Sequence, residues 1–139
     1  MKKAMNNKGF SLVELIIVVA IMAVLVGVLA PQYIKYLDKS KVGADKQLAD
    51  NLKQAITTTL LDPDVTNAPS SATSAAIGAK SGQFWTAVHG IMGTNSYSDM
   101  QSKLKLQTGA TIKYSIDGNK AVSVHVTYTG SNSEYTFTV

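Results

Sequence analysis

The fold is decided by residues 9–33, GFSLVELIIVVAIMAVLVGVLAPQY, a stretch that is apolar almost throughout. From Phe10 to Ala30, 18 of 21 residues are apolar, and no charged residue occurs in the 20 positions from Leu15 to Ile34. A helix of that length rises about 30 Å, which is enough to cross the hydrocarbon core of a bilayer. The stretch therefore predicts a membrane-spanning helix near the start of this 139-residue chain.

The remainder of the chain has the composition of an ordinary small domain. Cysteine is absent, which excludes disulfides, thiolate zinc sites and a cysteine nucleophile. The formal net charge is +4, and Lys2, Lys3 and Lys8 supply +3 of it before the apolar stretch begins. Residues 62–139 carry five lysines and five acidic residues, so we expect no direct nucleic-acid binding, which needs a clustered basic surface. The leader lysines also predict a cytoplasmic N-terminus and an external C-terminal part.

Three uses of the apolar stretch compete: a secretory signal, a plain membrane anchor, and a segment that acts after export. A secretory signal has a small-residue cleavage site after its apolar region. Here the run leads through Ala30 into Pro31 without an A-x-A pattern, and a glycine stands before the run instead, at the junction Gly9–Phe10. This arrangement favours the third use.

Glu14 is the one charged residue inside the apolar stretch. A lone carboxylate at the centre of a membrane helix costs about 2.5–3.5 kcal/mol on insertion scales. One interpretation places Glu14 near the headgroups, at the helix N-terminus, where the helix dipole favours an acid. The other gives it a cationic partner: a cut after Gly9 would create an amino group on Phe10, four residues away, in the same chain or a neighbour.

The segment Gly9–Tyr33 closely resembles the N-terminus of type IV prepilins, through G-F-S-L-V-E-L, the apolar run and the closing P-Q-Y. The resemblance implies that prepilin peptidase removes a leader, residues 1–9, between Gly9 and Phe10, and that it N-methylates Phe10. It also implies that Phe10 and Glu14 act in subunit assembly, with Glu14 aligning the incoming subunit. Ser11 replaces the more usual threonine. The short leader looks like that of the type IVa group, and the family's common C-terminal disulfide is absent.

A helix break is predicted at Gly27 and Pro31. Pro31 has no N–H to donate to the carbonyl of Gly27, its ring crowds that carbonyl, and glycine is itself a weak helix former. The family resemblance implies that this stretch can unwind when the helix moves from bilayer to filament.

After Pro31 the pattern becomes amphipathic, with apolar residues at spacings of four or seven along one stripe. These residues are Tyr33, Leu37, Ala44, Leu48, Leu52, Ile56 and Leu60. The pairs Lys41–Asp45 and Lys46–Asp50 are spaced to form ion pairs on the helix surface. Asp62-Pro63-Asp64 ends the helix, because the residue before a proline is pushed out of the helical region. We predict one spine helix with a transmembrane and assembly half, 10–34, and an amphipathic half, 35–61.

The head, residues 62–139, begins with a predicted loop. Residues 66–82 are small and rich in serine and threonine. Phe84, Trp85, Val88, Ile91 and Met92 then have helical spacing up to Gly93, and we expect them to cover the spine; an aromatic binding surface around Trp85 is the alternative. Residues 98–106 are either a short helix begun by Ser98, with Gln101 as its capping partner, or a strand through 103–106.

The C-terminal part predicts an antiparallel β-meander of at least three strands. Apolar residues alternate with polar ones in three runs, separated by turns at 117–120 and 130–133. The runs contain Ile112, Tyr114 and Ile116; Val122, Val124, Val126 and Tyr128; and Tyr135, Phe137 and Val139. Because one face of this sheet is apolar, it should lie against the spine helix. The fold class is therefore α+β, the arrangement of the pilin fold.

No catalytic, metal or cofactor site is predicted. His89 and His125 fall in unrelated elements, and neither a G-x-S-x-G elbow nor a phosphate-binding loop occurs. Asp62 and Asp64 fall well short of the six to eight oxygens that calcium takes, so we interpret them as a helix stop. We expect no enzyme activity.

The preferred hypothesis is a structural subunit of a type IV pilus that serves adhesion, motility or DNA uptake. Its partners would be the membrane before assembly, prepilin peptidase, the pilus assembly machinery and further copies of itself in a helical filament. It would reside in the inner or cytoplasmic membrane as a precursor and in an extracellular pilus afterwards. The alternatives are a pseudopilin or competence pilin and, in another class, a monomeric membrane-anchored binding module.

Overall fold

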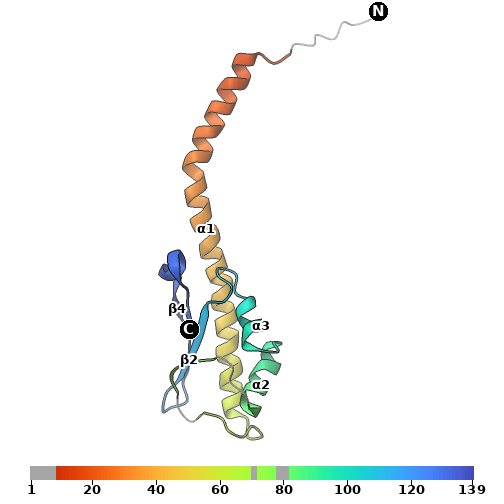
Figure 1. Cartoon of the computed structure of the whole chain (residues 1–139), viewed down its shortest axis with the longest axis vertical. Coiled ribbons are helices and arrows are strands. Elements are labelled where there is room, and N and C mark those ends of the chain that lie inside the picture. Colours follow the sequence, from red (N-terminus) through yellow and green to blue (C-terminus); the bar gives the residue numbers. More distant parts are fainter. Residues whose placement is uncertain (1–8, 70–71, 78–81) are drawn as a thin grey trace, which may run out of the picture. The chain divides into compact units, whose positions relative to one another are not determined.

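The structure is a computed structural model that describes residues 9–69, 72–77 and 82–139. It divides into two units, Met1–Leu37 and Asp38–Val139, which we describe separately. One helix, α1 (Leu12–Leu61), contributes its first part to the first unit and its second part to the second (Figure 1). The leader predicted at residues 1–9 lies outside the described residues except for Gly9.

The first unit consists of the apolar part of α1. The helix begins at Leu12, two residues later than predicted, because Ser11 acts as its N-terminal cap. It remains α-helical through Gly27 and Pro31, where the sequence predicts a break. A proline removes one backbone hydrogen bond, and here the bonds of the neighbouring turns hold the helix. Unwinding between Gly27 and Pro31 therefore stays a prediction about the filament.

In the second unit, α1 presents a buried stripe to the core. The stripe differs from the predicted one, since Ala44 is exposed and Leu48 is half-buried. Its members are Val42, Asp45, Ala49, Leu52, Ala55, Ile56, Thr59 and Leu60. The observed spacings are mostly three and four residues, as the 3.6-residue turn requires, whereas the predicted stripe used spacings of four and seven. A buried aspartate in the stripe concealed this pattern in the sequence.

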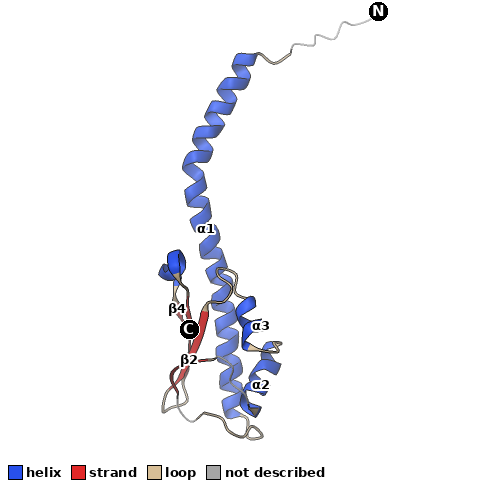
Figure 2. Ribbon diagram, in the orientation of Figure 1, coloured by secondary structure: helices blue, strands red, loops and turns tan. Residues whose placement is uncertain are grey.

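The sheet of the second unit is antiparallel, with four strands in the order β1-β2-β3-β4, which confirms the α+β class (Figure 2). The strands are β1 (Ala72–Ala76), β2 (Thr111–Ile116), β3 (Val122–Thr127) and β4 (Phe137–Thr138). The apolar residues of β2 and β3 alternate as predicted and pair across the strands, Ile112 with Val126 and Tyr114 with Val124.

Strand β1 corrects the prediction of a loop over 66–82. Its sequence, ATSAA, has no apolar alternation that would reveal a strand. It forms because β2 offers an open edge and because Ile77, directly after β1, is fully buried and donates its N–H to the carbonyl of Ile112 at 3.3 Å.

The last predicted strand is shorter than expected. Gly130–Tyr135, which includes the predicted turn at 130–133, forms a 3₁₀ helix, so Tyr135 lies outside β4. Val139 extends the pairing, because its N–H and C=O both bond to Val124, at 2.9 and 3.0 Å.

Among its described residues, the second unit also contains two short α-helices, α2 (Gln83–Met92) and α3 (Tyr97–Ser102). Helix α2 ends as predicted at Gly93, whose φ of 60° is the left-handed conformation that glycine adopts most easily. Helix α3 is capped by Ser96, whose hydroxyl accepts the N–H of Asp99 at 3.2 Å, and not by the predicted Ser98. The predicted partner, Gln101, instead donates its side-chain amide to the carbonyl of Ala110 at 2.7 Å.

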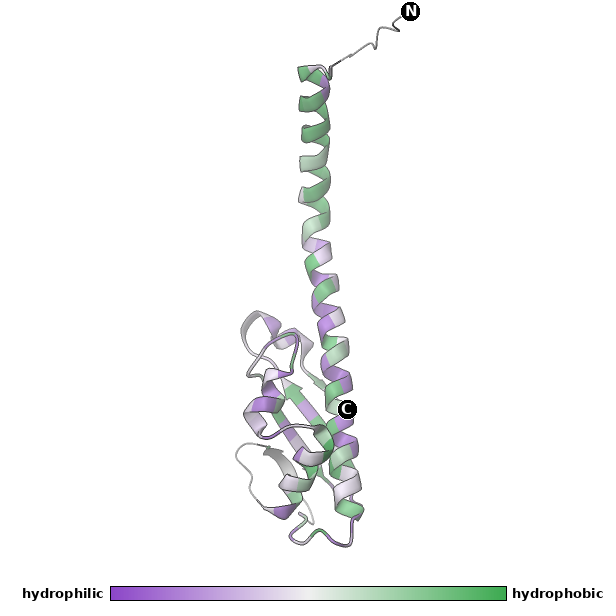
Figure 3. Cartoon of the chain, turned by 90° about the vertical axis from the view of Figure 1, so that its right-hand side faces the viewer, coloured by the Kyte–Doolittle hydropathy of each residue, from purple (hydrophilic) through white to green (hydrophobic). Residues whose placement is uncertain are grey.

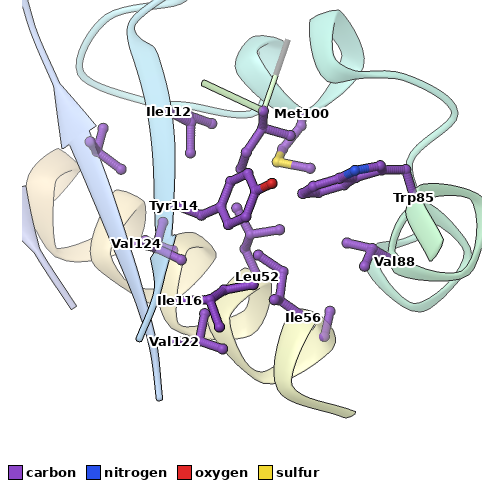
Figure 4. Packing of buried hydrophobic residues seen from close by; sticks show 14 of the residues in the cluster. Leu52, Ile56, Trp85, Val88, Met100, Ile112, Tyr114, Ile116, Val122 and Val124 are labelled. Carbon is purple, nitrogen blue, oxygen red and sulfur yellow. The ribbon is translucent and has the colours of Figure 1, made fainter. Parts of the chain in front are cut away.

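The core lies where the second part of α1, the inner face of the sheet and the two short helices meet (Figure 4). Trp85 is 6% exposed and packs edge-to-face on Phe84 and Tyr114, with ring centroids 5.2 and 5.1 Å apart. Trp85 therefore belongs to the core, which contradicts the alternative of an aromatic binding surface.

Candidate assembly surface

The N-terminus of α1 is capped by two reciprocal hydrogen bonds that involve Ser11 and Glu14. The hydroxyl of Ser11 accepts the N–H of Val13 at 3.3 Å, and the carboxylate of Glu14 accepts the N–H of Ser11 at 3.1 Å. A helix leaves its first N–H groups without backbone partners, and this S-x-x-E arrangement satisfies two of them. Sequence reasoning missed the cap, although the spacing of Ser11 and Glu14 is its signature.

The cap places the carboxylate of Glu14 at the N-terminal end of α1, where the helix dipole favours negative charge. In the uncut chain Phe10 carries an amide nitrogen, so the amine partner does not yet exist. Phe10 directly precedes Ser11, the residue whose N–H Glu14 already accepts. A cut after Gly9 would therefore create its amino group one residue from an existing contact of Glu14.

The first part of α1 carries a continuous run of apolar residues, and their side chains are exposed within the described residues (Figure 3). Phe10 is 93% exposed, and the large apolar side chains from Leu12 to Ile34 are between 47% and 73% exposed. This helix is long and apolar enough to cross a membrane, and none of its most apolar window is buried within the described residues. Such a large exposed apolar surface indicates contact with lipid, with protein, or with each in turn.

Gly27 and Pro31 lie within this apolar surface. Apart from the backbone of its own helix, a methyl group added at Gly27 would meet no neighbouring atom within 4 Å among the described residues, so packing there does not require a glycine. Whether the glycine and the proline form a weak point is a question about the filament, and the break stays a prediction.

Asp45 is a functional candidate that sequence reasoning assigned to the surface. It is 1% exposed and accepts three hydrogen bonds, from the N–H of Lys105 at 2.6 Å, the N–H of Leu106 at 3.1 Å and the hydroxyl of Tyr128 at 2.7 Å. The predicted pair with Lys41 does not form, because Lys41 lies 3.6 Å from Asp38 instead. Asp45 thus links α1 by hydrogen bonds to two segments that are distant in sequence, residues 105–106 and Tyr128.

The contact with Asp45 also affects the pKa of Tyr128. Burial, the hydrogen bond to Asp45 and the negative charge of Asp45 all raise the pKa of Tyr128 well above its usual value of 10. The hydroxyl therefore stays protonated and remains a donor to Asp45 across the physiological pH range.

The two histidines make ordinary hydrogen bonds within the second unit. Nδ1 of His89 lies 2.9 Å from the hydroxyl of Thr94, and the ring of His125 bridges the hydroxyls of Ser115 and Thr138 at 3.3 and 2.7 Å. No group of three potential metal ligands occurs in the described residues.

Comparisons with known proteins agree with the N-terminal pattern. A family profile described as the prokaryotic N-terminal methylation motif matches residues 4–30. The type IV major fimbrial protein FimA of Dichelobacter nodosus is 33% identical over 107 residues, which cover 77% of this chain and 66% of that protein. The fimbrial protein of Moraxella nonliquefaciens is 43% identical over 52 residues, covering 37% of this chain and 34% of that protein.

A further relative is similar over almost its whole length. The prepilin peptidase-dependent protein A of Clostridium perfringens is 29% identical over 126 residues, covering 87% of this chain and 86% of that protein. Matches to the fimbrial proteins are shorter, since the chain spans 66% of one FimA protein but 36% of another. No solved structure matches significantly.

Proposed function

We propose that this chain, which belongs to the type IV pilin family, polymerises into a pilus filament through the first part of α1. The observation that carries the proposal is the uncovered apolar surface from Leu12 to Ile34. A helix with this surface has two favourable environments, the hydrocarbon of a bilayer and the side chains of sister helices. A structural subunit uses both, one before and one after assembly.

The proposed maturation begins at the junction Gly9–Phe10. Prepilin peptidase would cut there and methylate the new amino group of Phe10. The matched methylation motif and the similarity to a protein named for its dependence on prepilin peptidase support this step. The junction itself is accessible, because Gly9 and Phe10 are both exposed.

Glu14 would then act in assembly. Its carboxylate lies at the first turn of α1 and accepts the N–H of Ser11, the residue that follows the one that would bear the new amine. In a filament core the surroundings are apolar, and an isolated carboxylate there is costly unless a cation neutralises it. The methylated amine of Phe10, from the same or a neighbouring subunit, supplies that cation and so favours one axial position of the incoming subunit.

We further propose that the precursor resides in the cytoplasmic or inner membrane and that the mature subunit ends in a pilus on the cell surface. The similarity to a type IV major fimbrial protein supports the role of a major subunit. The helix break at Gly27 and Pro31 would then allow α1 to adjust to its neighbours. The assembly machinery and further copies of the chain are its expected partners.

Two measurements test the proposal. Mass spectrometry of sheared surface filaments should find a mature chain that begins at N-methylated Phe10, and a chain that still carries residues 1–9 in filaments would contradict the processing step. Electron microscopy of cells that lack the chain should show the loss of fibres. A chain that persists as a monomer would favour the membrane-anchored binding module.

Paired variants separate the charge of Glu14 from its role as a cap. Glu14→Gln keeps an oxygen that can accept the N–H of Ser11 but removes the charge, and it should insert normally and assemble poorly. Ser11→Ala removes the hydroxyl that caps Val13 but keeps the charge, and it should assemble. Normal filaments from Glu14→Gln would show that the charge is not used.

A further inference from the structure

The outer end of the apolar surface carries two exposed tyrosines and a lysine. Tyr33 is 63% exposed and Tyr36 is 72% exposed, and Lys35 between them is also exposed. All three lie on α1 within the first unit. Lys35 is the first charged residue after the 20 uncharged positions from Leu15 to Ile34. This segment therefore marks an abrupt change from an apolar to a polar helix surface.

The spacing to Glu14 matches the thickness of a bilayer core. Tyr33 follows Glu14 by 19 residues and Tyr36 follows it by 22. At 1.5 Å per residue these separations are about 28 and 33 Å along the helix, and the hydrocarbon core of a bilayer is about 30 Å thick. When the tyrosines lie at one surface of the core, Glu14 lies at the other.

The chemistry of the three side chains suits the headgroup layer. A tyrosine ring is apolar along its body and polar at its hydroxyl, and such rings concentrate at membrane interfaces. A lysine extends its apolar stem along the helix and places its ammonium among lipid phosphates. The hydroxyl groups of Tyr33 and Tyr36 accept and donate hydrogen bonds there, which neither could do in the hydrocarbon.

We propose that Tyr33, Lys35 and Tyr36 form an interfacial anchor that binds the outer phospholipid headgroup layer and sets the depth of the precursor in the membrane. The anchor holds Glu14 in the opposite headgroup layer, where its carboxylate stays hydrated. This inference rests on the proposed function, because it takes the precursor to be a membrane protein. It adds that Glu14 loses its hydration only when the subunit leaves the bilayer for the filament.

The absence of cysteine from the chain makes a depth measurement straightforward. A single reporter cysteine, Gln32→Cys, carries an environment-sensitive fluorophore, and the full chain is inserted into vesicles of phosphatidylcholine and phosphatidylglycerol. Spin-labelled lipids that quench at known depths locate the fluorophore. In the otherwise unchanged chain we expect it at the edge of the hydrocarbon, below the headgroups.

The test variant replaces the anchor by three leucines: Tyr33→Leu, Lys35→Leu and Tyr36→Leu. It lengthens the uncharged run to Leu37, three residues further, so the reporter should move about 4–5 Å toward the bilayer centre. A matched control places three leucines inside the same helix, Val24→Leu, Val26→Leu and Val28→Leu, and should leave the reporter in place. Circular dichroism confirms equal helix content in all three chains.

A second reporter tests the other end. A membrane-impermeant thiol reagent is added on the side of the membrane where the N-terminus lies. Ser11→Cys should react with it both in the chain that keeps Tyr33, Lys35 and Tyr36 and in the control with leucines at positions 24, 26 and 28. Equal reporter depths in the leucine variant and the control would overturn the inference, and the tyrosines would then be contacts between subunits in the filament. That result leaves the proposed function intact, because the function is tested separately, by mass spectrometry of the mature N-terminus and by electron microscopy of the fibres. A chain that fails to insert at all would refute both.

Discussion

Replacing Asp45 by alanine should strongly destabilise the second unit. The carboxylate is buried and accepts three hydrogen bonds, from Lys105, Leu106 and Tyr128. A buried donor that loses its acceptor costs about 1–3 kcal/mol. The hydroxyl of Tyr128 is buried and takes the upper part of that range, whereas the two loop N–H groups lie nearer to water and take the lower part. The sum is about 4–5 kcal/mol, a large share of the 5–15 kcal/mol typical of a domain.

The assay is thermal unfolding of the full chain in detergent, followed by the fluorescence of Trp85, which is packed in the core. For a unit of roughly 100 residues, each kcal/mol shifts the midpoint by about 4–8 °C, so Asp45→Ala should lower it by at least about 16 °C. Asp50→Ala removes the same charge from an exposed position of the same helix and should change stability by no more than about 0.5 kcal/mol. Equal midpoints for the two variants would refute the reasoning.

The remaining predictions concern pH and two local features of the backbone. Because the pKa of Tyr128 is raised in the folded state, its stabilising effect is complete below about pH 10 and falls as the pH rises further. Unfolding midpoints measured across this range should fall more steeply for the unchanged chain than for Tyr128→Phe, and parallel curves would contradict this. Gly93→Ala forces alanine into a left-handed conformation and should cost about 1 kcal/mol in a denaturant titration, whereas Gly118→Ala, at a glycine without a positive φ, should cost less. Pro31→Ala should restore one backbone bond and stiffen α1, which hydrogen exchange near Gly27 would report as slower exchange; unchanged exchange and unchanged filament packing would argue against a weak point.

Sequence reasoning predicted the elements that have strong periodicity. The uncharged run predicts a helix, and the alternating apolar residues predict β2 and β3, more strongly than any other pattern in those segments. The structure confirms the helix and both strands. Strand β1 was not predictable in this way, because ATSAA forms a strand only through pairing with β2 and the burial of Ile77. Tertiary context decides such weak segments.

Polar residues caused the other differences. The sequence pattern predicts an exposed position for Asp45, because aspartate is almost never fully buried without partners. Its partners are two loop N–H groups and Tyr128, 60 to 83 residues away, which no local pattern reveals. The hydrogen bond from the N–H of Ser11 to Glu14, by contrast, follows a local S-x-x-E pattern that the sequence shows directly.

Under the proposed maturation and assembly, the two interpretations of Glu14 describe successive states of one residue. In the uncut chain the carboxylate accepts the N–H of Ser11 and needs no cation. Under the proposed maturation, removal of residues 1–9 takes away three lysines, so that 10 lysines face 9 acidic residues and the formal side-chain charge falls from +4 to +1. The same cut adds one amino group beside the cap. On this proposal, the leader lysines would serve orientation in the membrane. The positive charge used in assembly would be a single amine on Phe10, the residue before the one whose N–H Glu14 accepts.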